Sequence, residues 1–194
     1  HRSDDDDDRD DPVTITSTRT TSANVIAGTA IADFLVGDDT ASTIAGQEGA
    51  DFIYGDTPTN LLSGTHNISN TLTNPTFNGA GDADLISGGA GDDSIWGGAG
   101  DDTIVWNVGD GRDTVDGGTD TDTFEVNGNG SGETFYIETV ADFNTRMVDE
   151  GRPGQQLSTP TDTEIVVSRA VGSGNSSVLA ELENIDDIDI NGLG

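Results

Sequence analysis

Aspartates recur in this sequence at intervals of 18 or 20 residues. The pairs are Asp33 and Asp51, Asp84 and Asp102, Asp93 and Asp113, and Asp102 and Asp122. If the fold stacks each pair, two carboxylates about 4 Å apart repel by ~1 kcal/mol in water and by about 4 kcal/mol at an effective dielectric constant of about 20. A hard divalent cation between the two carboxylates turns this repulsion into a net attraction, and oxygen-only ligands favour calcium or magnesium. Flexible loops with backbone carbonyls suit calcium better than the strict octahedron of magnesium, so the spacing predicts calcium sites.

The interval comes from a nonapeptide repeat. Residues 88–96 (GGAGDDSIW) and 97–105 (GGAGDDTIV) are nearly identical, with aspartate at position 6 and isoleucine at position 8. The same frame fits 79–87, five consecutive units over 19–63, and two units over 108–125 after the extra residues Trp106 and Asn107. Every unit has a large apolar residue at position 8, namely Ile26, Leu35, Ile44, Ile53, Leu62, Ile86, Ile95, Ile104, Val115 and Phe124. A fixed period of this kind predicts a solenoid.

Two repeats are expected to form one coil of 18 residues. The glycines at positions 1, 2 and 4 permit the backbone angles of a tight turn. Positions 7 to 9 then form a short strand whose middle residue points inward, and coils stack about 4.8 Å apart. Units n and n+2 lie on the same side, which brings their position-6 residues together. The core is little more than two facing columns of position-8 side chains, so folding depends on stacking.

Composition limits the classes of function. The 194 residues include 37 acidic residues and seven basic ones, all arginine, for a formal charge of −30. This charge argues against nucleic acid and anionic membrane surfaces as partners. The sequence has no cysteine, which excludes disulfides and thiolate metal sites, and shows no apolar run of membrane-span length and no signal peptide. A hydrophobic content of 31% with high charge favours disorder, but the repeat argues for a folded chain.

The units GGAGDDSIW and GGAGDDTIV match the G-G-x-G-x-D-x-U-x nonapeptide, so residues 19–125 resemble the RTX (repeats-in-toxin) family. The resemblance implies a right-handed parallel β-roll that is secreted by a type I system, disordered in low-calcium cytosol and folded outside the cell. It implies three or four or more calcium ions with side-chain ligands from Asp33, Asp51, Asp84, Asp93, Asp102, Asp113 and Asp122. It also implies backbone carbonyl ligands from Ala80, Asp82, Gly89, Gly91, Gly97, Gly98, Ala99, Gly100, Gly117 and Thr119.

The early part of the repeat departs from the family pattern. Position 6 is uncharged in Asn24, Ser42 and Asn60, and this stack is expected to bind no metal. Residues 64–78 are expected to be an inserted half-turn in which Phe77 serves as an apolar plug. Asp102 is then the one position-6 acid with a full-glycine turn and an aspartate on both sides, and it is expected to be shared by two ions.

The two ends of the chain carry no repeat. Residues 1–18 are expected to be an acidic tail and lead-in, and the initial HRS resembles the remnant of a tag. Residues 126–194 are expected to be a β-strand cap on the open end of the roll, with strands at 133–139, 163–171 and 178–190 and a loop at 151–160. The acids Asp186, Asp187 and Asp189 are interpreted as a solvated strand face. The final INGLG suggests a piece of a longer protein.

Catalysis finds little support in the sequence. His1 lies in the tail and His66 in the insertion, and Asp11-Pro12 alone is weak evidence for a self-cleaving bond. We therefore expect an all-β protein without enzymatic activity, a calcium-binding structural module of a large secreted or cell-surface bacterial protein of adhesin or surface-layer type. The alternative is a calcium-binding accessory domain of a type I-secreted hydrolase or toxin whose catalytic domain lies outside this chain. The expected partners are calcium and the type I secretion machinery, while self-association stays open.

Overall fold

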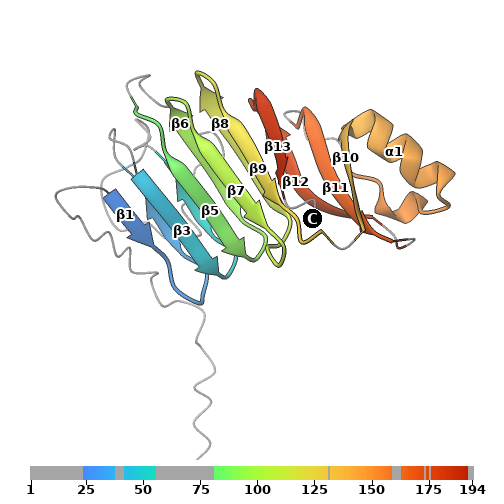
Figure 1. Ribbon diagram of the computed structural model, residues 1–194, viewed down its shortest axis with the longest axis horizontal. Helices are drawn as coiled ribbons and strands as arrows, with labels where there is room; N and C mark the ends of the chain where they lie inside the picture. Colours follow the sequence, from blue (N-terminus) through green and yellow to red (C-terminus); the bar gives the residue numbers. More distant parts are fainter. Residues whose placement is uncertain are drawn as a thin grey trace, which may run out of the picture.

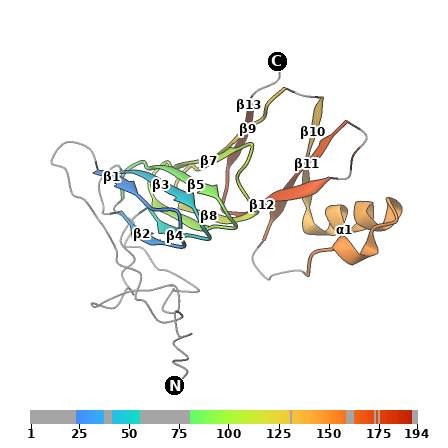
Figure 2. The same ribbon diagram turned by 90° about the horizontal axis from the view of Figure 1, so that it is seen from below.

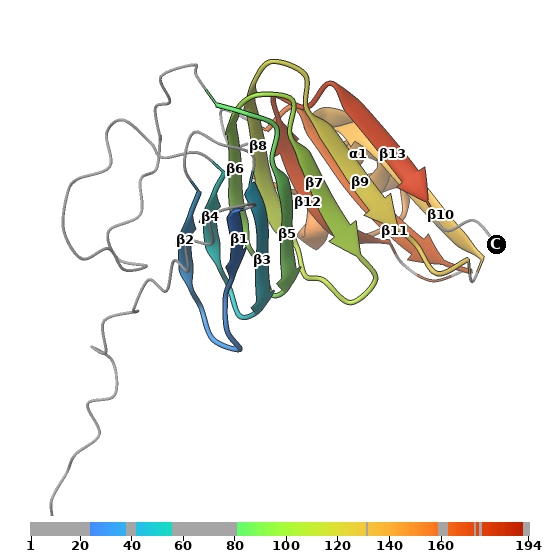
Figure 3. The same ribbon diagram turned by 60° about the vertical axis from the view of Figure 1, so that its left-hand side comes forward.

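The computed structural model describes residues 24–37, 42–55, 81–130, 132–158, 163–172, 174 and 176–191. Most of these residues lie in two β-sheets that face each other (Figures 1 and 3). Sheet A contains, in order, β1 (Asn24–Ala27), β3 (Ser42–Glu48), β5 (Leu85–Ala90), β7 (Thr103–Asn107), β9 (Thr123–Asn127) and β13 (Asp187–Asn191). Sheet B contains, in order, β2 (Phe34–Val36), β4 (Phe52–Tyr54), β6 (Ser94–Ala99), β8 (Asp113–Thr119), β12 (Ser177–Glu183), β11 (Ile165–Val171) and β10 (Glu133–Thr139).

The repeat strands alternate between the two sheets and pair in parallel within each. Position-8 residues are in register in sheet A (Ile26, Ile44, Ile86, Ile104 and Phe124) and in sheet B (Leu35, Ile53, Ile95 and Val115). All of these side chains are at most 7% exposed and belong to one hydrophobic cluster between the sheets. The parallel β-roll predicted from the repeat is confirmed.

The interruption of the repeat is longer than predicted. β3 pairs directly with β5, and β4 with β6, so the coil of β3 and β4 stacks on the coil of β5 and β6. Gly55 and Asp84 occupy positions 1 and 6 of one turn and are 29 residues apart, compared with five for Gly46 and Asp51, so this turn carries 24 additional residues. The expectation that the unit 55–63 follows in the stack is wrong, because β5 provides the next strand beside β3. Both Leu62 and Phe77 lie outside the described residues.

The last two strands of the chain continue the roll. β12 pairs in parallel with β8, with Leu182 beside Val115, and β13 pairs in parallel with β9, with Ile188 beside Phe124. The run at 178–190, predicted as one strand, is two strands joined by a turn in which Asn184 has a φ of 50°. The predicted strands at 133–139 and 163–171 correspond to β10 and β11, which add antiparallel to the edge of sheet B beyond β12 (Figure 2).

A helix, α1 (Val140–Asp149), follows β10 and was not predicted, so the described part of this mostly β fold includes one α-helix. Thr139 caps its N-terminus, because its hydroxyl accepts a hydrogen bond from the backbone N–H of Asp142 at 3.1 Å. One face of the helix, with Val140, Phe143 and Met147, is buried against the sheet. A short 3₁₀ helix (Pro153–Gln155) lies within the predicted loop at 151–160.

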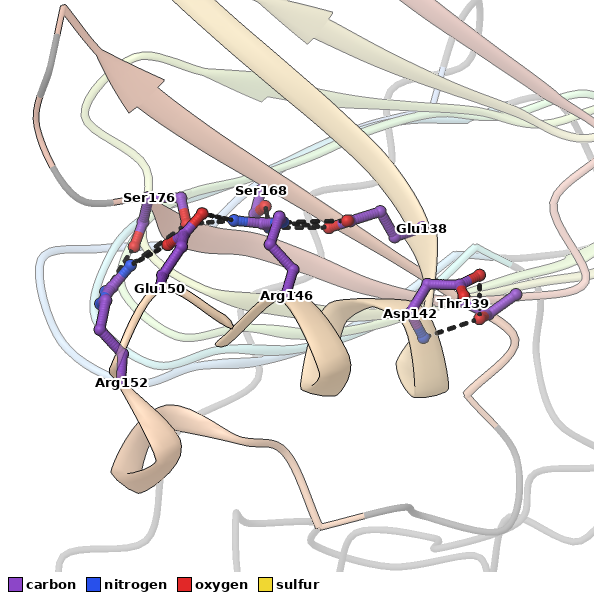
Figure 4. A network of polar contacts seen from close by, with 8 residues as sticks. All are labelled: Glu138, Thr139, Asp142, Arg146, Glu150, Arg152, Ser168 and Ser176. Atoms are coloured by element: carbon purple, nitrogen blue, oxygen red, sulfur yellow. Dashed lines mark hydrogen bonds and ion pairs between the residues drawn. The ribbon is translucent and has the colours of Figure 1, made fainter. Parts of the chain in front are cut away.

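Arg146 ties α1 to the sheet (Figure 4). Its guanidinium forms ion pairs with Glu138 of β10 at 2.7 Å and with Glu150 at 3.0 Å. It also donates hydrogen bonds to the hydroxyls of Ser168 and Ser176, each at 2.9 Å. The hydrogen bond with Glu138 is the largest of the effects that raise the pKa of Arg146.

Candidate metal sites at the turns of the roll

The predicted aspartates gather in two columns, one along each edge of the roll. Each member stands at or just before the start of a strand. The first column, which leads into sheet B, consists of Asp33, Asp51, Asp93 and Asp113, and the second, which leads into sheet A, consists of Ser42, Asp84, Asp102 and Asp122. All of these side chains are at most 6% exposed. Charged carboxylates are rarely buried to this degree without a partner of opposite charge.

Hydrogen bonds connect neighbours along both columns. In the first column the backbone N–H donates to the Oδ1 of the next member, from Asp33 to Asp51 (2.8 Å), Asp51 to Asp93 (2.7 Å) and Asp93 to Asp113 (3.1 Å). In the second column the same bonds run from Ser42 to Asp84 (2.6 Å), Asp84 to Asp102 (2.8 Å) and Asp102 to Asp122 (2.9 Å). Every pair expected from the spacing of 18 or 20 residues is therefore adjacent.

Two adjacent pairs were missed in the sequence. Asp51 lies beside Asp93, and Ser42 beside Asp84, each at a separation of 42 residues. The signal was the 24-residue interruption, which must be added to the coil length of 18. The expected stack of Ser42 on Asn60 is wrong, because Asp84 occupies that place. Asn60 itself and the side chain of Asn24 lie outside what the structure describes.

In three of these aspartates, the second carboxylate oxygen, Oδ2, is buried without a hydrogen-bond partner. The Oδ2 atoms of Asp51, Asp93 and Asp122 are buried and make no hydrogen bond. These residues are 1%, 2% and 0% exposed. Removing a carboxylate oxygen from water without replacing its hydrogen bonds costs several kcal/mol, on the order of the net stability of a small domain. The arrangement fits an oxygen-binding cation.

The position-1 glycines leave the space in which oxygens from adjacent coils converge. A Cβ on Gly46 would stand 2.2 Å from Asp51 Oδ2 and 2.2 Å from the Gly88 carbonyl oxygen of the next coil. A Cβ on Gly97 would likewise meet Asp102 Oδ2 at 2.4 Å and the Gly117 carbonyl at 2.4 Å. Glycine is therefore required here by close approach, since any side chain would displace the two oxygens.

Asp33, in the first coil, is different. Its Oδ2 accepts hydrogen bonds from the backbone N–H of Thr29 at 2.5 Å and from the Thr29 hydroxyl at 2.9 Å. The carboxylate is thus satisfied by its own turn, which has threonine at position 2 in place of glycine.

Burial raises the pKa of several column aspartates. It is the largest cause at Asp51, Asp93 and Asp122, whose pKa values rise from 3.8 to about 6. Burial also raises the pKa of Asp113 to about 8, with further contributions from Asp93, Asp110 and Asp92. In the absence of a cation, these groups bind protons at a higher pH than an ordinary aspartate does, which means that the fold disfavours their charged form.

A model of the RTX calcium-binding nonapeptide repeat matches residues 27–57, 76–105 and 107–128, in four copies. These residues belong to the RTX repeat family. No curated protein sequence matches the chain. The RTX repeats bind calcium, and several repeats imply several ions. The repeat is a structural calcium-binding module of secreted bacterial proteins rather than a catalytic unit. No helix in the described part of the chain is long and apolar enough to cross a bilayer.

Calcium sites in these RTX repeats would depend on backbone carbonyls as well as aspartates. Among the described residues, no three carboxylate or imidazole side chains gather as a metal site. Calcium accepts carbonyl oxygens readily, so the donor set fits this ion. Two of the predicted carbonyls, those of Gly97 and Gly117, point into the glycine-lined space beside Asp84 and Asp102.

Other predicted carbonyls of the RTX turns have different surroundings. The Thr119 carbonyl accepts a hydrogen bond from the Gly100 N–H at 3.3 Å. The carbonyl of Asp82 faces Gly100 of the adjacent turn, and Ala80 lies outside the described residues. The Gly88 carbonyl was not predicted, although its place at position 1 of the following coil was the available signal. The assignment of ligands stays a prediction.

Proposed function

We propose that this chain is a calcium-folded structural module of a large secreted or cell-surface bacterial protein of adhesin or surface-layer type. The observation that carries the proposal is the set of buried Oδ2 atoms at Asp51, Asp93 and Asp122 that make no hydrogen bond. When the chain folds without a cation, these oxygens lose their hydrogen bonds to water and gain no hydrogen bond in return. The net charge of −30 adds repulsion between carboxylates to this cost. The thin core between the sheets offers little to offset this cost.

The side-chain ligands would be the predicted aspartates of the two columns. Five of them accept a hydrogen bond from the backbone of the preceding coil at Oδ1 and face the space beside a position-1 glycine with Oδ2, namely Asp51, Asp84, Asp93, Asp102 and Asp122. Bound calcium would supply the positive charge that the stacked carboxylates need. Because each site takes oxygens from two coils, ligand binding and coil stacking would be one event. Ser42, without charge, is proposed to take no part.

The proposed sites belong to the weak extracellular class of calcium sites. Dissociation constants on the order of 10⁻⁴ to 10⁻³ M are typical of such modules. A site that binds only the folded chain adds about 2.7 kcal/mol of stability at a calcium concentration 100 times its dissociation constant. Several such sites acting together are enough to decide whether a marginal domain folds. The chain would thus stay disordered in a low-calcium cytosol, pass through a type I system and fold outside.

Far-UV circular dichroism tests this proposal. We expect little β signal in chelator, a strong β signal in millimolar calcium, and a much weaker response to the same concentration of magnesium. Identical spectra in calcium and chelator would contradict the proposal. The sequences that flank this chain in its parent protein would separate the adhesin or surface-layer role from an accessory role beside a secreted hydrolase or toxin.

A further inference from the structure

The second aspartate column does not stop at the last RTX repeat. The backbone N–H of Asp122 donates to Oδ2 of Asp186 at 3.1 Å, although the two residues are 64 positions apart. The backbone N–H groups of Asp186 and Asp187 both donate to the Asp122 carbonyl at 3.0 Å. Asp186 immediately precedes β13, as the column aspartates precede their strands, and β13 pairs in parallel with β9. Asp186 therefore occupies the place of a position-6 aspartate in a coil that has no nonapeptide sequence.

The glycine-lined space between adjacent coils is also repeated here. A Cβ on Gly117 would stand 2.2 Å from the Asn184 carbonyl oxygen and 2.6 Å from Asp122 Oδ2. These distances are close to those at Gly46 and Gly97 within the repeats. Asp122 is 0% exposed, and its Oδ2, which faces this space, makes no hydrogen bond. The buried oxygen thus needs a ligand that the residues around it do not supply.

The turn that precedes β13 is built to present the Asn184 carbonyl. Asn184 adopts a φ of 50°, a left-handed conformation that asparagine tolerates better than most residues. Its side-chain amide donates to Oδ1 of Asp116 in the neighbouring coil at 2.9 Å. The carbonyl is held in place from both directions, by the backbone conformation and by the side chain.

The first column ends in a different way. The residue beside Asp113 in the last coil is Ala180, which offers no oxygen from its side chain. Beside this pair, Arg112 and Glu181, which directly precede Asp113 and follow Ala180 in the sequence, form an ion pair. The same terminal coil thus ends one column with an ion pair and extends the other with a carboxylate, so the carboxylate at Asp186 is specific to the second edge.

We propose that Asp122 Oδ2, the Asn184 carbonyl and the Asp186 carboxylate form a further calcium site that joins β13 to the roll. The inference rests on the proposed function of the repeats and extends it to residues beyond the RTX match, which ends at residue 128. Its consequence is that the terminal strand docks through a calcium ion, so the cap and the roll respond to the same ligand.

The test compares Asp186→Asn with Asp189→Asn in the full chain. Asparagine keeps the shape and still accepts the hydrogen bond from the Asp122 N–H, but it removes the charge. Asp189, an exposed acid of the adjoining strand β13, serves as the control. Equilibrium dialysis should show one calcium ion fewer for Asp186→Asn than for the wild type and no change for Asp189→Asn. Hydrogen exchange should show that residues 187–191 of Asp186→Asn need at least tenfold more calcium for protection.

Equal ion counts and equal protection for Asp186→Asn and the wild type would overturn the inference while leaving calcium binding by the repeats intact. An absence of calcium binding in the wild type would instead overturn the proposed function. If Asp186→Asn does not fold, a crystal structure of the wild type grown in calcium decides the question. Anomalous density between Asp122 Oδ2 and the Asn184 carbonyl supports the site, and density at the repeats but not there excludes it.

Discussion

Two residue types do the chemical work in each turn, an aspartate that presents a buried oxygen and a glycine that makes room for it. The spacing of the aspartates was enough to predict which of them are adjacent wherever the repeat is regular. It failed for Asp51 and Asp93, because an insertion of unknown path hides how many residues separate two coils. The local nonapeptide pattern also gave no reason to connect Asp122 with Asp186, since the cap has no glycine-rich turn.

Replacing Gly97 by alanine should weaken calcium binding through a steric clash. The new Cβ would stand 2.4 Å from both Asp102 Oδ2 and the Gly117 carbonyl, two oxygens that must keep their positions. Overpacking of this kind costs about 1–3 kcal/mol, so the calcium midpoint measured by circular dichroism should rise about tenfold. Gly154→Ala is the control, because a Cβ there meets nothing within 4 Å. Equal midpoints for the two variants would contradict the geometry of the site.

Asp93 should matter more than Asp33, although both belong to the first column. Asp93 lies between Asp51 and Asp113 in a full-glycine turn. The prediction that Asp102 is the one acid of this kind with an aspartate on both sides is therefore wrong. Asp33 has one aspartate neighbour, and its Oδ2 is already satisfied by Thr29. In calcium titrations, Asp93→Asn should raise the midpoint by about tenfold or more and Asp33→Asn by about twofold or less, by analogy with the contact energies of charged hydrogen bonds. A larger rise of the calcium midpoint for Asp33→Asn than for Asp93→Asn would contradict the prediction that Asp93 is the more important calcium ligand.

At the scale of elements, the strands of the roll were predictable and the cap was only partly so. Position-8 residues predict each repeat strand because a single buried side chain defines its inward face. The strands β10 and β11 follow from alternating apolar residues. Helix α1 was missed because Val, Asp, Asn and Thr in its sequence are weak helix formers, and the buried positions 140, 143 and 147 were the one signal. The division into β12 and β13 depends on pairing with strands far away in sequence, which no local pattern shows.

Arg146 should stabilise the cap much more than Arg112. The Arg146 side chain is 15% exposed and pairs with Glu138, which is 17% exposed, so removing one partner leaves a largely buried charge. Arg146→Ala should lower the free energy of unfolding in saturating calcium by about 3 kcal/mol, measured by urea denaturation. Arg112 is 46% exposed and forms a single ion pair, so Arg112→Ala should cost less, about 1–2 kcal/mol, mostly from the Glu181 carboxylate, which is 9% exposed and loses its partner. A similar cost for both variants would contradict this account of the cap.

At the scale of the whole molecule, the stability of the calcium-free fold should depend on pH, because the buried aspartates become charged as the pH rises. The folded-state pKa values of Asp51, Asp93 and Asp122 are about 6, above the ordinary value of 3.8. The folded chain therefore binds protons more tightly than the unfolded chain, and its stability falls as the pH rises from 3.8 through these raised values. In chelator, the β signal should be stronger at about pH 4.5 than at about pH 8. A stronger signal at the higher pH would contradict the assignment.

Asp113 extends this pH dependence upward, since its pKa rises to about 8. Asp113→Asn should therefore flatten the loss of β signal between about pH 6 and pH 8 and leave the loss at lower pH in place. An unchanged profile would mean that another group titrates in that range.

The most direct test of calcium-coupled folding is the radius of gyration measured by small-angle X-ray scattering in calcium and in chelator. For a chain of 194 residues, general scaling gives about 47 Å for the unfolded chain and about 16 Å for a compact domain. Calcium at several millimolar should move the measured value most of the way from the first to the second, and chelator should reverse the change. A compact particle of the same size in both solutions would contradict the account, because the roll would then be stable without the ions that its aspartate columns are proposed to bind.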